Sequence, residues 1–441
     1  MAKRHGGWFA GALRARRDHR APVRASADTA LFVSFSITSL VCLTTLVCLA
    51  TLFSACGGKD SNSAVAALPV DAPTAPQSDL VFAGRALERA PLPCASAILI
   101  EPTTNTVLYE QGAHELRAPA SIVKMTLQLV VLREIEAGRL ALTDSIRVSE
   151  WASNIGGSQA YLAAGEVFSL EELMKAIVIH SANDACAAVA EHIAGTTDGF
   201  VELMNREVQH LGLTDTRYVN VHGLDDEPTD GNVTTAYDIA QIARELIRFP
   251  KVLEWSSIEK TEFRNGAFIL ENTNKLIGRF EGCDGLKTGY TSRAGFCLCA
   301  TAERDNLRLI SVVMGCAANR DRFGESAELL ASGFNSYSLV AGSPKPADLG
   351  QEIEIRGGKP KLVRPVLGSA TAVLVSRPDD RGIVRRFVPD PTLRAPLNAG
   401  DPVGKMQILS RDKVLAELPV VTPVAVEATG LMAWFRRSTG K

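Results

Sequence analysis

Three short polar motifs occur in order along this chain: Ser121-Ile-Val-Lys124, Ser181-Ala-Asn183 and Lys287-Thr-Gly289. The first motif is weak evidence alone, because Ser-x-x-Lys arises by chance on the order of once or twice in a chain this long. Two such matches, Ser257-Ile-Glu-Lys260 and Ser410-Arg-Asp-Lys413, have no Ser-x-Asn after them. The complete set constrains the fold, since three widely separated segments must meet in one cleft if they act together.

The first motif pairs a nucleophile with a base. A serine hydroxyl needs a neighbouring base at neutral pH, and Lys124 reaches Ser121 if a helix begins at or just before the serine. Ala118-Pro-Ala120, read as extended or turn-like, and the apolar run after Met125 predict that start. A helix start favours negative charge beside Ser121. Burial and a second cation, Lys287, would keep part of Lys124 neutral. Taken alone, Lys124 reads as an ordinary lysine on a helix flank.

The second motif lies at a joint between helices. Ser169-Leu-Glu-Glu172 is a capping box that predicts a helix to about Ile179, and Asn183 begins another. A tight turn there can direct Ser181 and Asn183 into one cleft. The alternative is that both residues only cap helices, for which Ser and Asn are favoured.

The third motif is predicted on an edge strand. Residues 296–302 and 307–314 read as strands joined by a hairpin, which places the motif on or beside the edge of that sheet. Lysine attracts a carboxylate, a threonine hydroxyl bonds to it, and glycine allows a substrate backbone to approach closely. We therefore expect Lys287, Thr288 and Gly289 to line the cleft, although the segment alone would read as a solvated turn.

These motifs belong to a wider pattern, which also includes Asn183-Asp-Ala-Cys186, Val221-His-Gly-Leu-Asp225, Asn272-Thr-Asn274 and Asp284-Gly-Leu-Lys-Thr-Gly289. The pattern resembles the D-alanyl-D-alanine carboxypeptidases, the low-molecular-mass penicillin-binding proteins, whose motif triad is shared with class A β-lactamases. The resemblance runs from about Leu92 to Phe334 and is weaker beyond. It implies an α/β (α+β) penicillin-binding-protein/β-lactamase-like transpeptidase fold, with a helical cluster packed on an antiparallel sheet, followed by a small all-β domain.

The resemblance also implies a role for each site residue. Ser121 would be the acylated nucleophile, Lys124 its base and Ser181 the proton relay to the leaving group. The substrate-binding residues would be Asn183 for the substrate amide, Lys287 and Thr288 for the terminal carboxylate, Gly289 beside them, Tyr290 with Ser121 as backbone N–H donors to the oxyanion, and Arg322 as an extra carboxylate ligand. Many relatives have histidine at the position of Tyr290, so any side-chain contribution there is in doubt.

The implied activity is removal of the terminal D-alanine from peptidoglycan stem peptides ending in D-Ala-D-Ala, with β-lactams as acylating inhibitors. A DD-endopeptidase and a class A-like β-lactamase are alternatives, although no Glu-x-x-x-Asn element for deacylation is evident. A non-catalytic wall-binding or penicillin-sensing module is disfavoured by the intact nucleophile and base. No cofactor or metal is expected. The formal net charge of −2 gives no sign of the basic surface that binds nucleic acid.

The N-terminus has the organisation of an export signal. A basic flank precedes an apolar run over about residues 29–55, and Leu52-Phe-Ser-Ala-Cys56-Gly resembles a lipoprotein cleavage box, with Cys56 as the lipidated residue. An uncleaved membrane anchor and a structural role for Cys56 are alternatives. We expect an exported protein, tethered to the membrane on the periplasmic side of the cell envelope.

Composition divides the chain further. We expect an export signal over 1–56, a flexible tether over 57–88 rich in Ala, Pro, Ser and Gly, and a catalytic domain over 89–342. Short alternating segments at 352–356, 370–376, 382–388, 404–409 and 414–420 predict a β domain over 345–424. The tail, 425–441, could form a short amphipathic anchor around Trp434 or fray.

Six cysteines lie beyond the export segment: Cys94, Cys186, Cys283, Cys297, Cys299 and Cys316. In an oxidising compartment they could form disulfides or stay as buried thiols. Cys297 and Cys299 share one face of a predicted strand, so a bond between them is disfavoured. A zinc site is disfavoured because matching histidines are missing from the sequence.

Overall fold

The computed structural model describes residues 82–225, 231–368 and 371–430. The export signal, Cys56, most of the predicted tether and the tail from residue 431 lie outside these ranges. Over the described ranges, no helix combines the length and the apolar character needed to cross a membrane.

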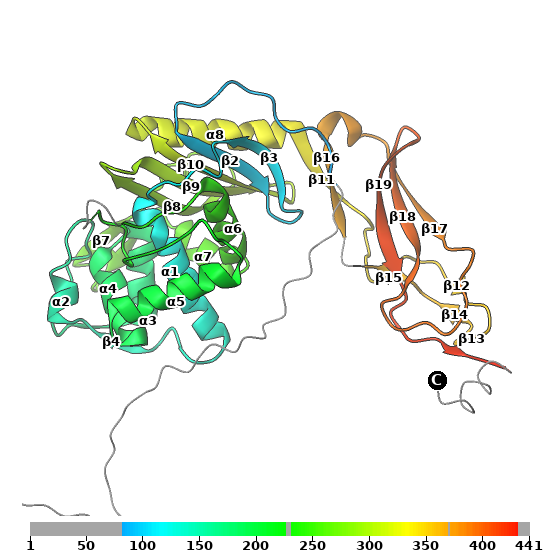
Figure 1. Cartoon of the computed structure of the whole chain (residues 1–441), viewed down its shortest axis with the longest axis horizontal. Helices are drawn as coiled ribbons and strands as arrows, with labels where there is room; N and C mark the ends of the chain where they lie inside the picture. The colour runs from blue at the N-terminus through cyan, green and yellow to red at the C-terminus, as the bar shows by residue number, and fades with distance from the viewer. Residues whose placement is uncertain (1–81, 226–230, 369–370, 431–441) are drawn as a thin grey trace, which may run out of the picture. The chain divides into compact units, whose positions relative to one another are not determined.

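An antiparallel sheet of five strands organises the first part of the described chain, in the order β3-β2-β10-β9-β8 (Figure 1). Strand β8 is therefore an edge strand. The strands are β2 (Ser96–Glu101), β3 (Thr106–Gln111), β8 (Cys283–Thr291), β9 (Gly295–Arg304) and β10 (Leu307–Cys316).

Both faces of this sheet are buried, because its strands carry apolar side chains on alternate sides. On β10, Leu309 and Val313 join a core shared with helix α8 (Asn319–Ser336), whereas Val312 joins the core on the opposite face. Figure 1 shows α8 along one face and the other helices on the other. Gly333 of α8 permits the close contact, since a Cβ there would lie 2.5 Å from a methyl carbon of Leu309. The result is three layers.

The second helical layer carries the first two sequence motifs. It is built from η1 (Ala120–Val123), α1 (Lys124–Glu136), α2 (Glu150–Ser153), α3 (Leu170–Lys175), η2 (Ala176–His180), α4 (Asn183–Ala194), α5 (Thr197–His210), α6 (Ala236–Leu246) and α7 (Pro250–Ser256). Two small antiparallel pairs accompany the helices, β4 (Ser145–Arg147) with β5 (Val167–Ser169) and β6 (Lys260–Phe263) with β7 (Phe268–Glu271).

Local signals in the sequence account for several boundaries. The capping box at Ser169 is present, with its hydroxyl accepting from the N–H of Glu172 and the Glu172 carboxylate accepting in return. The β9–β10 hairpin turns at Asp305 and Asn306, which both have positive φ. Such a turn matches the twist of the strands, and Asp and Asn tolerate this conformation. Both elements confirm the sequence prediction.

The C-terminal region is all-β. A four-stranded antiparallel sheet has the order β15-β19-β18-β17, and β16 pairs with both β11 and β1. Its elements are β11 (Tyr337–Ala341), β12 (Ile353–Glu354), β13 (Gly358–Lys359), β14 (Leu362–Val363), β15 (Val366–Leu367), β16 (Ala372–Ser376), η3 (Arg377–Asp379), β17 (Ile383–Pro389), β18 (Pro402–Ser410), β19 (Lys413–Val421) and β20 (Glu427–Ala428), with β1 (Phe82–Ala83). The predicted fold class, helices on an antiparallel sheet followed by an all-β region, is confirmed.

Two of the six cysteines are bonded. Cys94 and Cys316 form a disulfide, which joins the chain just before β2 to the end of β10. Cys186, Cys283, Cys297 and Cys299 are free thiols. Cys297 and Cys299 lie on one face of β9 and contribute to the same core, as their spacing predicted.

Candidate active site

Ser121 lies in the short helix η1, and α1 begins at Lys124, so the first motif stands at a helix start as predicted. The Lys124 ammonium nitrogen, Nζ, is 2.8 Å from Ser121 Oγ. Lys124 is completely buried. The structure therefore brings the proposed nucleophile and base into direct hydrogen-bond contact.

Lys124 is held by three further acceptors from two other segments. Its Nζ donates to Asn183 Oδ1 at 2.7 Å, to the His222 carbonyl oxygen at 2.9 Å and to Ser181 Oγ at 3.3 Å. Every polar side chain of the first two motifs thus converges on one nitrogen atom. Burial lowers the pKa of Lys124 to about 8, and the negative charge of Asp184 opposes that shift. A minor neutral fraction of Lys124 is therefore available near neutral pH, and it grows as the pH rises to about 8.

The second motif occupies the tight turn between η2 and α4. Ser181 has a left-handed backbone, with φ of 66°, which ends η2 and allows α4 to begin at Asn183. The Asn183 Nδ2 donates to the carbonyl of Gly156 at 2.6 Å, so its Oδ1 is the atom that faces Lys124. Both polar groups of Asn183 are engaged within the protein, and the side chain holds Lys124 in place.

Asp184, next to Asn183, fastens a loop to the site. Its two carboxylate oxygens accept from the N–H groups of Ala160 at 3.1 Å and Leu162 at 3.0 Å. The carboxylate is fully buried, and these hydrogen bonds offset the cost of burying it. The loop before Ala160 includes Gly156, which supports Asn183.

The third motif lies on the edge strand β8, as predicted, and β8 packs against η1. A Cβ at Gly289 would lie 2.8 Å from the carbonyl oxygen of Pro119 and 3.1 Å from the backbone nitrogen of Ser121. Only glycine allows this approach. The close packing brings the backbone of β8, including Tyr290, beside the nucleophile.

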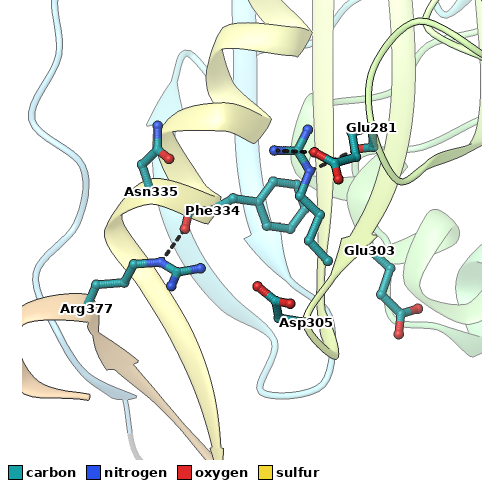
Figure 2. A pocket seen from close by; sticks show the side chains of 7 residues that line it. Glu281, Glu303, Asp305, Phe334, Asn335 and Arg377 are labelled. Atoms are coloured by element: carbon teal, nitrogen blue, oxygen red, sulfur yellow. Dashed lines mark hydrogen bonds and ion pairs between the residues drawn. The ribbon is translucent and has the colours of Figure 1, made fainter. Parts of the chain in front are cut away.

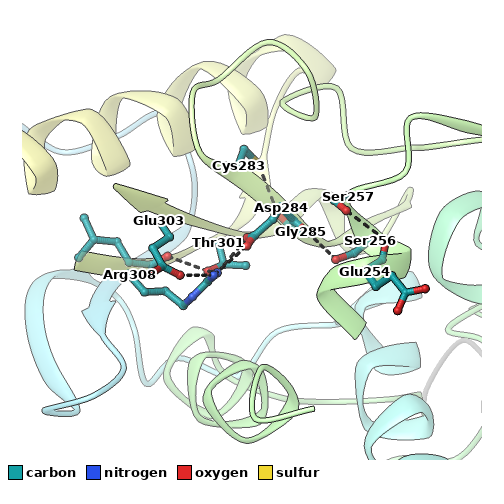
Figure 3. Close-up of polar contacts among 10 residues, drawn as sticks. Glu254, Ser256, Ser257, Cys283, Asp284, Gly285, Thr301, Glu303 and Arg308 are labelled. Carbon is teal, nitrogen blue, oxygen red and sulfur yellow. Dashed lines mark hydrogen bonds and ion pairs between the residues drawn. The ribbon is translucent and has the colours of Figure 1, made fainter. Parts of the chain in front are cut away.

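A polar cluster anchors the beginning of β8 (Figure 3). Arg308 forms a fork with Asp284, with Nη1 to Oδ1 at 2.9 Å and Nη2 to Oδ2 at 2.8 Å, and also donates to Glu303. On the other side, Ser256 at the end of α7 donates to the carbonyl of Asp284 at 2.5 Å. Bidentate pairs of this kind fix geometry as well as adding free energy.

The Asn272-Thr-Asn274 segment also supports β8. Asn274 donates to the carbonyl of Gly285 at 2.9 Å, and Thr288 Oγ1 donates to Thr273 Oγ1 at 2.8 Å. Lys287 is buried, and its Nζ donates to the carbonyl of Thr288 at 2.9 Å. Burial and the positive charge of Lys124 hold the pKa of Lys287 well below its usual value. A substrate carboxylate would relieve this by supplying a counter-charge.

Tyr290 and Arg322 occupy different settings. Tyr290 is 55% exposed and stacks on Phe296, with ring centroids 4.2 Å apart, so its side chain lies at the surface. Arg322, on α8, donates to the carbonyl oxygens of Gly289 at 2.8 Å and Cys297 at 3.4 Å. In this structure Arg322 therefore supports β8 through the carbonyl of Gly289.

One part of the site was missed by reasoning from side-chain chemistry. The His222 carbonyl accepts from Lys124, and Ser121 Oγ lies 3.4 Å from the same oxygen. The sequence signal is the Val221–Asp225 segment, which contributes only to the family resemblance. A backbone carbonyl leaves no residue-type signature, so its role becomes visible only in the folded chain.

The described chain also contains a cavity and side chains of metal-ligating types. A cavity of about 510 Å³ is lined by Glu281, Glu303, Arg304, Asp305, Phe334, Asn335 and Arg377, and includes no motif residue (Figure 2). Within residues 82–225, 231–368 and 371–430, no group of three or more His, Cys, Asp or Glu residues is placed to hold a metal ion.

Comparison with known proteins agrees with this site. Residues 85–318 match the family model described as D-alanyl-D-alanine carboxypeptidase. The chain belongs to the D-alanyl-D-alanine carboxypeptidase family. Residues 341–428 match the model for the C-terminal domain of penicillin-binding protein 5.

The matches to individual relatives cover most of the length of each relative. The chain is 32% identical to D-alanyl-D-alanine carboxypeptidase DacF of Bacillus subtilis over 349 residues, which cover 78% of this chain and 89% of that protein. Penicillin-binding protein 5 from Haemophilus influenzae has a similar structure, with a TM-score of 0.66, 28% identity and coverage of 77% of this chain and 99% of the other. Penicillin-binding protein D2 from Listeria monocytogenes, solved in an ampicillin-bound form, is 30% identical with a TM-score of 0.52, covering 56% of this chain and 100% of the other.

Proposed function

We infer that this protein is a serine-type D-Ala-D-Ala carboxypeptidase, which releases the terminal D-alanine of peptidoglycan stem peptides through an acyl-enzyme. The observation that carries this inference is the 2.8 Å contact between Ser121 Oγ and the buried amine of Lys124. A nucleophile needs a base in this position, and the base must be partly neutral. Membership of the carboxypeptidase family supports the same activity.

Acylation follows from the arrangement of three side chains. Neutral Lys124 accepts the proton of Ser121 Oγ as that oxygen attacks the carbonyl carbon of the penultimate D-alanine. The C–N bond of the tetrahedral intermediate then breaks, and Ser181 relays the proton from Lys124 to the departing amine nitrogen. The 3.3 Å contact between Lys124 Nζ and Ser181 Oγ supports this relay. Water later hydrolyses the Ser121 ester, with Lys124 as the base again.

Substrate orientation is proposed to come from β8. Lys287 and Thr288 would bind the terminal carboxylate, and Gly289 leaves room for the peptide backbone. The N–H groups of Ser121 and Tyr290 would donate to the oxyanion, and the packing of Gly289 against Ser121 supports that pairing. Arg322 would act indirectly, by holding the Gly289 carbonyl.

Release of D-alanine from diacetyl-Lys-D-Ala-D-Ala is the test of this activity. We expect the purified protein to release D-alanine and to form a covalent adduct with a fluorescent penicillin, and we expect Ser121→Ala to lose both. The adduct should map to the peptide containing Ser121 by mass spectrometry. Adduct formation in Ser121→Ala would contradict the assignment of the nucleophile.

Two further assays distinguish this activity from a DD-endopeptidase and from a β-lactamase. Digestion of intact peptidoglycan should yield free D-alanine, whereas cleaved cross-links without D-alanine would indicate a DD-endopeptidase. Nitrocefin should acylate the protein and be released slowly. Rapid turnover of nitrocefin would indicate a β-lactamase.

We also propose that the protein is exported and tethered to the membrane on the periplasmic side, through a lipid on Cys56. The basic flank, the apolar run and the small residues before Cys56 support this proposal. Mass spectrometry of the mature protein should find a lipidated cysteine at its N-terminus. An unmodified Cys56, or retained residues before it, would rule out the lipoprotein.

A further inference from the structure

The loop over residues 219–224 contributes a backbone carbonyl to the centre of the site. Lys124 Nζ donates to His222 O at 2.9 Å and to Asn183 Oδ1 at 2.7 Å. These two oxygens accept hydrogen bonds and cannot donate them. The hydroxyls of Ser121 and Ser181, at 2.8 and 3.3 Å, can do both.

This difference decides how a neutral Lys124 is oriented. A neutral amine has two N–H groups and one lone pair. The two carbonyl-type oxygens require both N–H groups, which leaves the lone pair directed at the serine hydroxyls. That orientation is the one in which Lys124 accepts the Ser121 proton. If the His222 carbonyl moved away, an N–H group could turn toward Ser121 instead and the base would be misdirected.

Two asparagines hold the loop that carries this carbonyl. Asn232 Oδ1 accepts from the N–H groups of Val219 at 2.7 Å and Asn220 at 3.2 Å, and its Nδ2 donates to Asn220 Oδ1 at 2.9 Å. Asn220 Oδ1 also accepts from the N–H groups of Gly223 at 2.7 Å and His222 at 3.3 Å. The peptide groups on both sides of the His222 Cα are thereby tied to one amide oxygen.

The same loop is pressed against the nucleophile. Gly223 has φ of 88°, and a Cβ there would lie 2.1 Å from the carbonyl oxygen of Ala120 and 2.9 Å from the Ser121 nitrogen. Asn220 Nδ2 donates to the carbonyl of Leu224 at 3.0 Å, which closes the turn around Gly223. A small change at the asparagine pair is therefore transmitted directly to Ser121 and Lys124.

We propose that Asn220 and Asn232 are positioning residues for acylation, because they hold the His222 carbonyl that, with Asn183, turns the lone pair of Lys124 toward Ser121. The inference rests on the proposed function, in which Lys124 is the base. It gives the Val221–Asp225 segment a role in the reaction through its backbone.

The test measures acylation by a fluorescent penicillin in stopped flow, which separates the acylation rate constant from the dissociation constant of the preceding complex. Asn220→Ala and Asn232→Ala should each lower the rate constant by about 10²-fold, the scale of a 1 Å misplacement of reacting groups. The dissociation constant should change by less than about twofold, because Lys287 and Thr288 are untouched. Asn220→Asp keeps the acceptor oxygen and should recover at least about tenfold over Asn220→Ala.

Asn205 supplies a matched control. Its side chain holds the backbone of Tyr218 with two hydrogen bonds of 2.8 Å, in the segment just before the loop, and among the described residues it forms no hydrogen bond with residues 220–224. Asn205→Ala should lower the melting temperature while the acylation rate constant per folded molecule stays within about twofold of wild type. Equal rate constants for Asn220→Ala and Asn205→Ala, or an effect on the dissociation constant alone, would overturn the proposal.

Further outcomes remain decisive if the alanine variants do not fold. Asn232→Asp keeps the acceptor for Val219 but cannot donate to Asn220 Oδ1, and should slow acylation by at least about tenfold. An unchanged rate constant in Asn232→Asp would refute the positioning role. Failure of the wild-type protein to be acylated would instead refute the proposed function, so the two failures are distinguishable.

Discussion

At the scale of single residues, the properties of the site depend on the burial of the Lys124 amine and on its hydrogen bonds. Lys124 is fully buried among four oxygen acceptors, and burial is the largest cause of its lowered pKa. The sequence had suggested that a second cation, Lys287, would contribute as well. Because the desolvated amine must be neutral to act, the rate of acylation becomes sensitive to pH.

Acylation should rise with pH through about 8, because deprotonation of Lys124 produces the active base. Below that value the rate constant should fall about tenfold per pH unit, as expected for a single ionisation. Burial lowers the pKa of His222 to about 4, so His222 does not titrate in this range. The measurement is penicillin acylation across neutral and alkaline pH. A flat profile through pH 8 would contradict Lys124 as the base.

The side chain of Tyr290 should be dispensable. It is exposed and stacks on Phe296, while the proposed donor to the oxyanion is its backbone N–H. Tyr290→Ala should therefore reduce acylation far less than the 10²–10³-fold typical for loss of an oxyanion donor. Tyr290→His should likewise keep the activity. A loss in that larger range for Tyr290→Ala, in folded protein, would assign the side chain a direct role.

Among the elements, β8 and η1 carry the arrangement together. The fork between Asp284 and Arg308 anchors the start of β8, and Gly289 lets the strand pack on Ser121. The distance between Ser121, the proposed nucleophile, and the proposed carboxylate ligands Lys287 and Thr288 thus depends on one interface between a strand and a helix start. Glycine at this interface is a steric requirement.

Gly289→Ala should abolish acylation, because its Cβ would lie 2.8 Å from Pro119 O and force β8 away from Ser121. Gly324→Ala is the matched control: it lies within α8, where a Cβ would meet nothing within 4 Å. This control should stabilise the protein by about 0.5–1 kcal/mol and leave acylation unchanged. The measurements are penicillin labelling and thermal unfolding of both variants. Normal labelling of Gly289→Ala would show that the close packing of β8 on Ser121 is not required for acylation.

Across the molecule, long-range links connect parts that are far apart in sequence. The Cys94–Cys316 disulfide joins residues with a sequence separation of 222. Strand β16 also pairs with β11 at the end of α8, across the domain boundary predicted near residue 344. Closing a long loop lowers the entropy of the unfolded chain, so the disulfide stabilises the fold.

Replacing both Cys94 and Cys316 by alanine should lower the free energy of unfolding by about 2–5 kcal/mol. Acylation should persist at temperatures where the variant is folded, since neither cysteine belongs to the three motifs. A reductant should lower the melting temperature of the wild type but leave that of the double variant unchanged. A response of both proteins to reductant would show that another bond is involved.

Short patterns in the sequence predicted the candidate reacting groups and the local elements that carry them. The capping box at Ser169, the β9–β10 hairpin and the shared face of Cys297 and Cys299 follow from short-range spacing, which reflects helix and strand periods. The candidate site residues follow instead from the order of the three motifs and from the family resemblance. The folded chain was needed to place the His222 carbonyl beside Lys124 and to pair Asn220 with Asn232. It was also needed to join Asp284 to Arg308 and Cys94 to Cys316. Backbone carbonyls carry no signature in residue type, and distant pairs depend on how whole elements pack, so neither could be read from local patterns.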